Sequence, residues 1–369
     1  MSPPKEPRDS IVAPSLFRSP LSRRIPAGPA SREAKAFKTR AHGCFEAGFA
    51  ENAAKMDRMT ATSAGKPALA VEERAARVLF PLFLSMRPEQ WVKNLVLPLP
   101  FLFGRALTSA RGWELAAAGL LVFCAVASAI YLVNDVVDRE RDGAHPVKRL
   151  RPLASGRLKP ESALTAAVVL GLAGLAGGFL LDPAFGRWCL FYAVLMTAYS
   201  VWLKRVPFLE ALIVAAGLPL RALAGAALAG LAPSLFLMGC AYLLALFLVV
   251  GKRQWELANA GRQSSSEHRS VLAAYRAEGL DFLFVVTALS TVAAYAAYSV
   301  VPSTFAMHGG RSFAPTIPFV VLGVARYVRL VYRRGGGGSP TRALLIDDPW
   351  ILLVVLGWVI TAGAVIYGR

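Results

Sequence analysis

Long apolar runs separated by short polar stretches dominate the chain from about residue 89 to its end. A helix needs about 20 predominantly apolar residues to cross the hydrocarbon core of a bilayer. Because lipid offers the backbone no hydrogen-bond partners, such runs predict helices. We count nine apolar segments, at 89–106, 113–136, 161–181, 187–203, 208–230, 233–251, 280–301, 313–332 and 349–367. The pattern therefore predicts an all-α, polytopic membrane protein.

The N-terminal part of the chain has a different character. Residues 1–75 are rich in Pro, Ser, Ala and charge, and they lack both a sustained apolar period and the apolar core of a signal peptide. We expect a disordered basic tail over 1–75, followed by a transmembrane domain over 76–369.

The charge distribution adds an orientation. Only 17% of residues are charged, yet the formal net charge is +18. In a soluble chain this excess would suggest nucleic-acid binding. Here Lys and Arg gather in the connections after the second, fourth, sixth and eighth apolar segments, as the positive-inside rule describes. We therefore expect a multi-pass protein of the inner (cytoplasmic) membrane, with a cytoplasmic N-terminus and an outside C-terminus. Membrane lipids are the expected surroundings, and we expect no nucleic-acid partner. A homo-oligomeric state is possible.

An acidic cluster stands at the end of the second apolar segment. Asp135, Asp138 and Asp142 follow Asn134, and helical spacing places these side chains on one stripe. Carboxylates this close repel one another, and ionisable groups at membrane depth are costly. A divalent cation would remove both penalties, and Mg²⁺ favours oxygen ligands together with substrate phosphates. The alternative is a solvated helix end whose carboxylates pair with nearby Arg and Lys.

A basic run over residues 145–152, which includes Lys148 and Arg149, follows the acidic cluster directly. A metal–diphosphate complex needs carboxylates on the metal side and Lys or Arg on the phosphate side. The combination therefore favours a diphosphate-using enzyme with its site on the cytoplasmic face.

These residues resemble the UbiA superfamily of intramembrane prenyltransferases. Asn134, Asp135, Asp138 and Asp142 match its NDxxDxxxD motif position by position. The resemblance implies nine transmembrane helices around a central cavity, with Mg²⁺ bridging the carboxylates and a diphosphate.

Within the superfamily the chain is similar to the decaprenyl-phosphate phosphoribosyltransferase branch, which acts in cell wall biosynthesis. The likeness lies at 87–94, 145–152, 199–204, 220–222, 251–256 and 348–349. It implies transfer of a 5-phosphoribosyl group from phosphoribosyl diphosphate to a polyprenyl (decaprenyl-type) phosphate. Aromatic prenyltransferases of the superfamily usually carry a second acidic motif, DxxxD. The matching region, 199–215, holds only Glu210.

The resemblance also implies roles for individual residues. Asp135, Asp138 and Lys204 are the expected catalytic residues, and Asp135, Asp138 and Asp142 the expected metal ligands. The expected substrate-binding residues are Asn134, Lys93, Asn94, Lys148, Arg149, Tyr199, Arg221, Lys252, Arg253 and Glu256.

Arg221 has an independent signal, because it is the one basic residue deep within an apolar segment. An intramembrane Arg is a functional candidate by default. Pro219 and Gly217 could break its helix and open this face to a cavity. The alternative is a structural ion pair with a carboxylate on a neighbouring helix.

Two other functions compete with phosphoribosyl transfer. The first is transfer of a prenyl group from a prenyl diphosphate to an aromatic or other acceptor, which needs a second pair of metal-binding carboxylates. The second is transport or non-catalytic lipid binding. Transport predicts charged residues along a path to both membrane faces, whereas here they gather on one face.

Overall fold

The computed structural model describes residues 78–145, 148–206, 208–258, 277–301, 311–333, 340 and 348–368. The predicted basic tail over 1–75 lies outside this part of the chain. All regular secondary structure in the described ranges is helical, which confirms the predicted all-α class. Seven helices there are long and apolar enough to cross a membrane.

Eight long helices match eight of the nine predicted apolar segments. They are α4 (Ala110–Val137), α6 (Pro160–Leu181), α7 (Pro183–Val201), α8 (Leu209–Leu228), α9 (Leu235–Ala258), α12 (Ala277–Val300), α14 (Ile317–Tyr332) and α16 (Pro349–Tyr367). Only α7 is not among the seven candidate membrane spans, because Arg187 near its start lowers its mean hydropathy.

The first apolar segment, 89–106, is not the single helix that the sequence predicts. It is divided among η2 (Pro88–Val96), α3 (Leu99–Phe103) and η3 (Ala106–Thr108). Pro98 and Pro100 cause the division, since proline lacks an N–H and clashes with the preceding helical turn. The expected count of nine spanning helices is therefore not confirmed.

Side-chain caps fix where several of the long helices begin. The Ser109 hydroxyl accepts a hydrogen bond from the Gly112 amide at the start of α4. Asp182 caps α7 and Asp348 caps α16 in the same way, and a proline follows each of these aspartates at the first helical position. Such caps satisfy backbone donors that a helix start leaves free.

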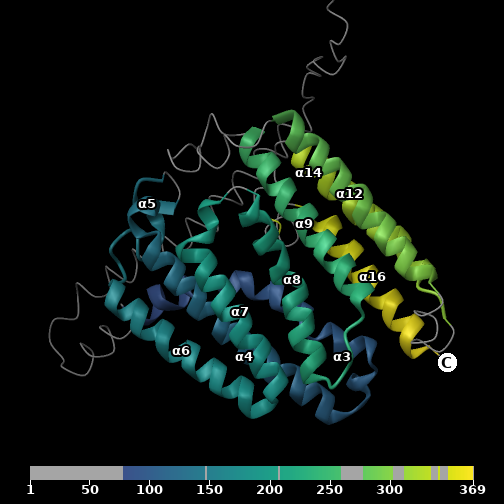
Figure 1. Cartoon of the computed structure of the whole chain (residues 1–369), viewed down its shortest axis with the longest axis horizontal. Coiled ribbons are helices and arrows are strands. Elements are labelled where there is room, and N and C mark those ends of the chain that lie inside the picture. Colours follow the sequence, from purple (N-terminus) through teal and green to yellow (C-terminus); the bar gives the residue numbers. More distant parts are fainter. Residues whose placement is uncertain are drawn as a thin grey trace, which may run out of the picture. The chain divides into compact units, whose positions relative to one another are not determined.

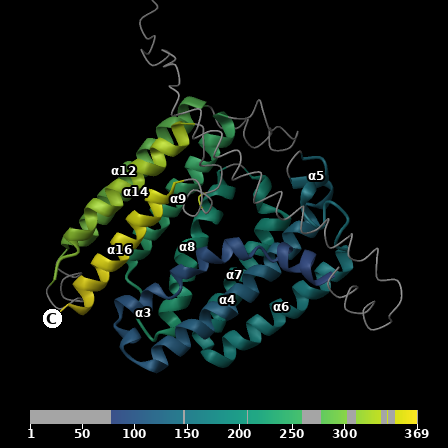
Figure 2. The same cartoon turned by 180° about the vertical axis from the view of Figure 1, so that it is seen from behind.

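The helices pack in chain order into two neighbouring groups (Figure 1). In the first, α4, α6, α7 and α8 surround a core that includes Phe123, Phe185 and Tyr192. In the second, α9, α12 and α14 enclose Phe247 and Phe284, whose rings stack with centroids 5.2 Å apart. Contacts between α8 and α9 join the two groups, and α16 packs on α14, as the reverse view also shows (Figure 2).

A close approach of backbones positions η2 against α8. A Cβ atom at Gly225 of α8 would lie 2.0 Å from the carbonyl oxygen of Leu97, so only glycine is accommodated there without a shift. Leu97 directly follows η2 and is fully buried. The contact therefore sets the distance between α8 and the segment that carries Lys93 and Asn94.

Candidate active site

The acidic cluster lies where α4 ends. The helix stops at Val137, Asp138 takes the capping position, and Asp142 belongs to the short helix α5 (Arg139–Gly143). The expected continuous helical stripe is therefore interrupted at Asp138. The three carboxylates also form two groups: Asp135 and Asp142 bind the same cation, Arg151, whereas Asp138 binds other cations.

Asp135 and Asp142 share Arg151. One guanidinium nitrogen, Nη1, lies 2.5 Å from Asp142 Oδ2 and 3.4 Å from Asp135 Oδ1. Asp135 also accepts a hydrogen bond from Arg87, and Lys148 Nζ lies 4.0 Å from Asp142. Both carboxylates are nearly inaccessible, with 3% and 4% of their surface exposed, so these cations supply the counter-charge that burial requires.

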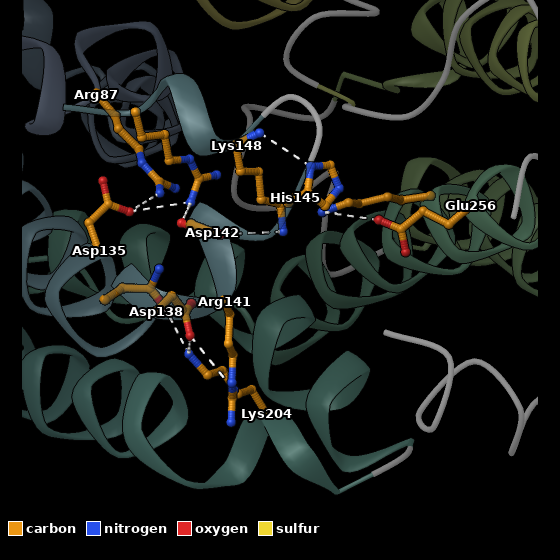
Figure 3. A network of polar contacts seen from close by, with 12 residues as sticks. Arg87, Asp135, Asp138, Arg141, Asp142, His145, Lys148, Lys204 and Glu256 are labelled. Carbon is orange, nitrogen blue, oxygen red and sulfur yellow. Dashed lines mark hydrogen bonds and ion pairs between the residues drawn. The ribbon is translucent and has the colours of Figure 1, made fainter. Parts of the chain in front are cut away.

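Asp138 forms the second group with Lys204 and Arg141 (Figure 3). Lys204 lies in η5 (Leu203–Arg205), directly after α7. Its Nζ donates to Asp138 Oδ1 at 2.6 Å and to Asn134 Oδ1 at 3.4 Å. The structure thus brings Lys204 to Asn134 and Asp138, from which it is 70 and 66 residues away in sequence.

Arg87 and Arg151 complete the cluster, although sequence reasoning did not choose them as site residues. Both lie in segments that carry the family resemblance, so a signal was available. Arg87 has a left-handed backbone, with φ 55° and ψ 61°. For a residue with a Cβ this conformation costs roughly 1–2 kcal/mol. Its guanidinium binds Asp135 and lies over the Tyr131 ring, so the strained turn serves to aim this side chain at the cluster.

The basic loop after α5 lies beside the carboxylates. Lys148 begins η4 (Lys148–Leu150), and its amide donates to His145 Nδ1 at 3.2 Å. Burial lowers the pKa of Lys148, and the charge of Arg151 lowers it further. Lys252 and Glu256 also affect this pKa, which places the end of α9 within electrostatic reach of the loop. Arg149 is exposed.

At the end of α9, Arg253 joins two glutamates. Its Nε and Nη2 donate to the two carboxylate oxygens of Glu210 at 2.7 and 2.6 Å, and its Nη1 donates to Glu256 at 2.5 Å. Lys252 lies 3.7 Å from Glu256. Glu210 is the single acidic residue in the region where aromatic prenyltransferases carry their second motif, and here an arginine neutralises it. Tyr199, at the end of α7, packs against the core of the first helix group.

Arg221 lies in the middle of α8, which remains continuous through Pro219, so the expected helix break is wrong. The guanidinium donates to Asn94 Oδ1 at 2.8 Å, to the Gly217 carbonyl at 2.5 Å and to the Tyr192 hydroxyl at 2.6 Å. Only 6% of Arg221 is exposed. In the described ranges no carboxylate forms an ion pair with it, which argues against the alternative of a structural ion pair.

The acidic cluster offers donors of the kind that Mg²⁺ uses. No group of three His, Cys, Asp or Glu side chains in the described part of the chain is arranged to hold a metal directly. However, a single cationic nitrogen of Arg151 already lies between Asp135 and Asp142. Carboxylate oxygens that converge on one positive charge are also suitable ligands for a divalent cation. Asp135 and Asp142 therefore fit such an ion if it replaces the Arg151 guanidinium.

The family assignment follows from comparison with known proteins. Residues 97–346 match the UbiA prenyltransferase family. This chain belongs to that family, as the NDxxDxxxD resemblance predicted. It is therefore a membrane-embedded transferase.

Individual relatives give a finer picture. The chain is 32% identical over 301 residues to a decaprenyl-phosphate phosphoribosyltransferase from Mycobacterium tuberculosis, covering 80% of this chain and 97% of that protein. It is 32% identical over 287 residues to the Corynebacterium glutamicum protein of the same name, covering 77% and 86%. A UbiA homolog from Archaeoglobus fulgidus bound to GPP and Mg²⁺ has the same fold, with a TM-score of 0.59, 18% identity and coverage of 78% of this chain and 99% of that one.

Proposed function

We propose that this protein transfers a 5-phosphoribosyl group from phosphoribosyl diphosphate to a polyprenyl phosphate of the decaprenyl type, with release of diphosphate. One observation carries the proposal. In the described part of the chain the carboxylates of the acidic cluster lie amid many cations, and Glu210, which stands where a second metal motif would be, is neutralised by Arg253. The relatives named as phosphoribosyltransferases over nearly their whole length support the same reaction.

The charge balance of the cluster favours a polyanionic substrate. Five cationic side chains contact the three carboxylates, namely Arg87, Arg141, Lys148, Arg151 and Lys204. Five positive and three negative charges leave an excess of two positive charges before any metal binds. A purely structural network needs no such excess, whereas a diphosphate would balance it.

Within this proposal Asp135, Asp138 and Asp142 would hold Mg²⁺, and Asn134 orients Asp138 through their shared contact with Lys204. When bound there, the ion would neutralise part of the diphosphate charge. The A. fulgidus homolog bound to Mg²⁺ supports metal use in this fold.

The remaining residues act on the leaving group and the acceptor. Lys148, Arg149 and Lys204 stabilise the charge that develops on the diphosphate as the bond between ribose C1 and oxygen breaks, a preorganised electrostatic effect. An oxygen of the polyprenyl phosphate forms the new bond to C1. This oxygen is already deprotonated, so the reaction needs no general base. Lys252 and Glu256 border the site at the end of α9.

The location of the reaction follows from the charge distribution. The acidic cluster and most loop Lys and Arg lie at the same helix ends, and Lys/Arg bias marks the cytoplasmic side. We therefore place the site and the N-terminus on the cytoplasmic face of the inner membrane. The alternative reaction is prenyl transfer from a prenyl diphosphate, and the pairing of Glu210 with Arg253 disfavours it.

Purified full-length protein in detergent, with Mg²⁺ and labelled phosphoribosyl diphosphate, tests the proposal. We expect label in the lipid only when polyprenyl phosphate is added, and at least about 100-fold less with Asp138→Asn, since transition-state contacts of this kind contribute about 100- to 1,000-fold. Glu140→Gln, an exposed carboxylate two residues away, is the matched control and should retain activity. Equal labelling by the two variants would refute the assigned cluster.

A further inference from the structure

Two cations deeper in the first helix group, Arg221 and Lys93, form no ion pair with a carboxylate in the ranges that the structure describes. Arg221 is buried, and its hydrogen-bond partners among the described residues are all neutral, namely Asn94, Tyr192 and the Gly217 carbonyl. Lys93 in η2 is half-buried, and the structure shows neither a hydrogen bond nor an ion pair from its ammonium to any described residue. Buried charges are normally paired or neutralised, so two neighbouring cations without a counter-ion call for an anion.

The two side chains are near neighbours. Lys93 precedes Asn94, whose amide oxygen accepts the hydrogen bond from Arg221 Nε. The charge of Arg221 lowers the pKa of Lys93, as do the charges of Lys252 and Arg87. Glu89 acts in the opposite direction but is the smallest of these influences, and it is exposed. Positive charge thus acts on Lys93 from Arg87, just before η2, from Arg221 in α8 and from Lys252 in α9.

Arg221 also has unused hydrogen-bonding capacity. A guanidinium offers five N–H donors, and three described contacts use one each. Two donors therefore remain for a ligand. The guanidinium carbon also lies 4.9 Å from the centroid of the Tyr192 ring, a cation–π contact that helps to hold the side chain in place.

This pair of cations is separate from the acidic cluster. Arg221 lies over the ring of Phe123, and the twelve residues from Phe123 to Asp135 on α4 span about 18 Å. The η2 segment runs between the two places, with Arg87 against Asp135 just before its start and Asn94 against Arg221 near its end. An anion bound by Lys93 and Arg221 would therefore not be the diphosphate that binds near Asp135 and Asp142, but a second phosphate group.

We infer that Lys93 and Arg221, aligned by Asn94, form a second anion site that binds a phosphate monoester. The inference rests on the proposed function for its two possible sources, the 5-phosphate of the donor and the phosphate of the lipid acceptor. The contacts of Arg253 with Glu210 and Glu256 remove that arginine from this role, although the sequence offered it as an equal candidate.

Direct binding tests the site without requiring any transfer. The probes are ribose 5-phosphate compared with ribose, and farnesyl phosphate compared with farnesol, titrated into the purified full-length protein. Lys93→Met should fold normally, because the Lys93 ammonium contacts no described residue. We expect it to weaken binding of one phosphate probe, or both, by about 10- to 100-fold, as loss of a charge-assisted contact does.

Controls and outcomes separate the two sources. Lys159→Met, an exposed lysine at the start of α6, should bind as the wild type does, and Lys93→Arg should retain binding. Loss confined to ribose 5-phosphate assigns the site to the donor, and loss confined to farnesyl phosphate assigns it to the acceptor. Unchanged affinity for both probes in Lys93→Met overturns the inference.

A further titration keeps this result distinct from the proposed function. Binding of inorganic diphosphate with Mg²⁺ reports on the acidic cluster and should be the same in Lys93→Met and the wild type. If phosphoribosyl transfer were absent but binding of the phosphate probes still depended on Lys93, the second anion site would be supported and the proposed reaction would be refuted.

Discussion

The contact between Arg253 and Glu210 gives a quantitative prediction about how α8 and α9 are held together. Glu210 is 1% exposed, and both of its carboxylate oxygens accept hydrogen bonds from one guanidinium. Replacing Arg253 with Met removes this bidentate partner. A buried carboxylate then remains without a counter-charge, which typically destabilises a fold by about 3–5 kcal/mol.

The second glutamate should contribute little to this loss. Glu256 keeps Lys252 at 3.7 Å, and its side chain is 19% exposed. The effect should therefore arise at Glu210, and a second substitution there should reverse it. In the double variant Glu210→Met/Arg253→Met no buried charge remains, and replacing a buried pair with apolar residues of similar size is often neutral or stabilising.

Thermal and denaturant unfolding in detergent, followed by tryptophan fluorescence, measures both effects. We expect the single variant Arg253→Met to lose about 3–5 kcal/mol and the double variant to recover most of it. Arg111→Met is the matched control, because its contact with Glu114 is 3.5 Å long and both side chains are largely exposed. Such a surface pair contributes at most about 1 kcal/mol.

Additive losses of stability from the two substitutions would contradict this explanation of the Arg253–Glu210 contact. If the double variant were less stable than Arg253→Met alone, burial of an unpaired Glu210 charge would not be the cause of the destabilisation. A loss no larger than that of the Arg111 control would likewise show that the pair is solvated in the protein.

Three further predictions concern the site and its support. Lys204→Met should weaken inhibition by product diphosphate about 10-fold or more, whereas Lys159→Met should not change it, as steady-state inhibition constants would show. Gly225→Ala should destabilise the fold by about 1–3 kcal/mol, because its Cβ would meet the backbone of Leu97 directly after η2. Gly239→Ala, with open space around it, should be neutral or slightly stabilising in the same unfolding assay. Burial and neighbouring cations lower the pKa of Lys93 from 10.5 to about 7, so Lys93 loses its charge as the pH rises through 7. Ribose 5-phosphate, whose second pKa is about 6, should therefore bind more weakly at pH 9 than at pH 7 in the wild type but not in Lys93→Arg, and equal pH profiles would contradict this.

The sequence was informative where a local pattern decides the structure. Apolar runs predicted the eight long helices because the length of a run and the need for internal backbone bonds determine what it forms in lipid. The NDxxDxxxD spacing likewise located the acidic cluster. The prediction of a single helix over the first apolar segment was wrong, because the prolines of this segment, rather than its hydropathy, determine its backbone conformation.

Long-range pairings could not be predicted from local patterns. The pairing of Arg87 with Asp135 joins residues 48 positions apart, and that of Arg253 with Glu210 joins residues 43 apart. Which residues form such pairs depends on how the helices pack, and the spacing of residues along the sequence does not reveal this packing. For the same reason, sequence analysis treated Lys93, Lys252 and Arg253 as equivalent, whereas the fold pairs two of them with carboxylates.

The mass of the lipid product distinguishes phosphoribosyl transfer from prenyl transfer. Purified protein would be incubated with Mg²⁺, phosphoribosyl diphosphate and polyprenyl phosphate, in parallel with a prenyl diphosphate and an aromatic acid. We expect a polyprenyl phosphate that has gained one phosphoribosyl group in the first reaction and no prenylated product in the second. Prenylation of the aromatic acid, with an unchanged lipid mass in the first reaction, would contradict it.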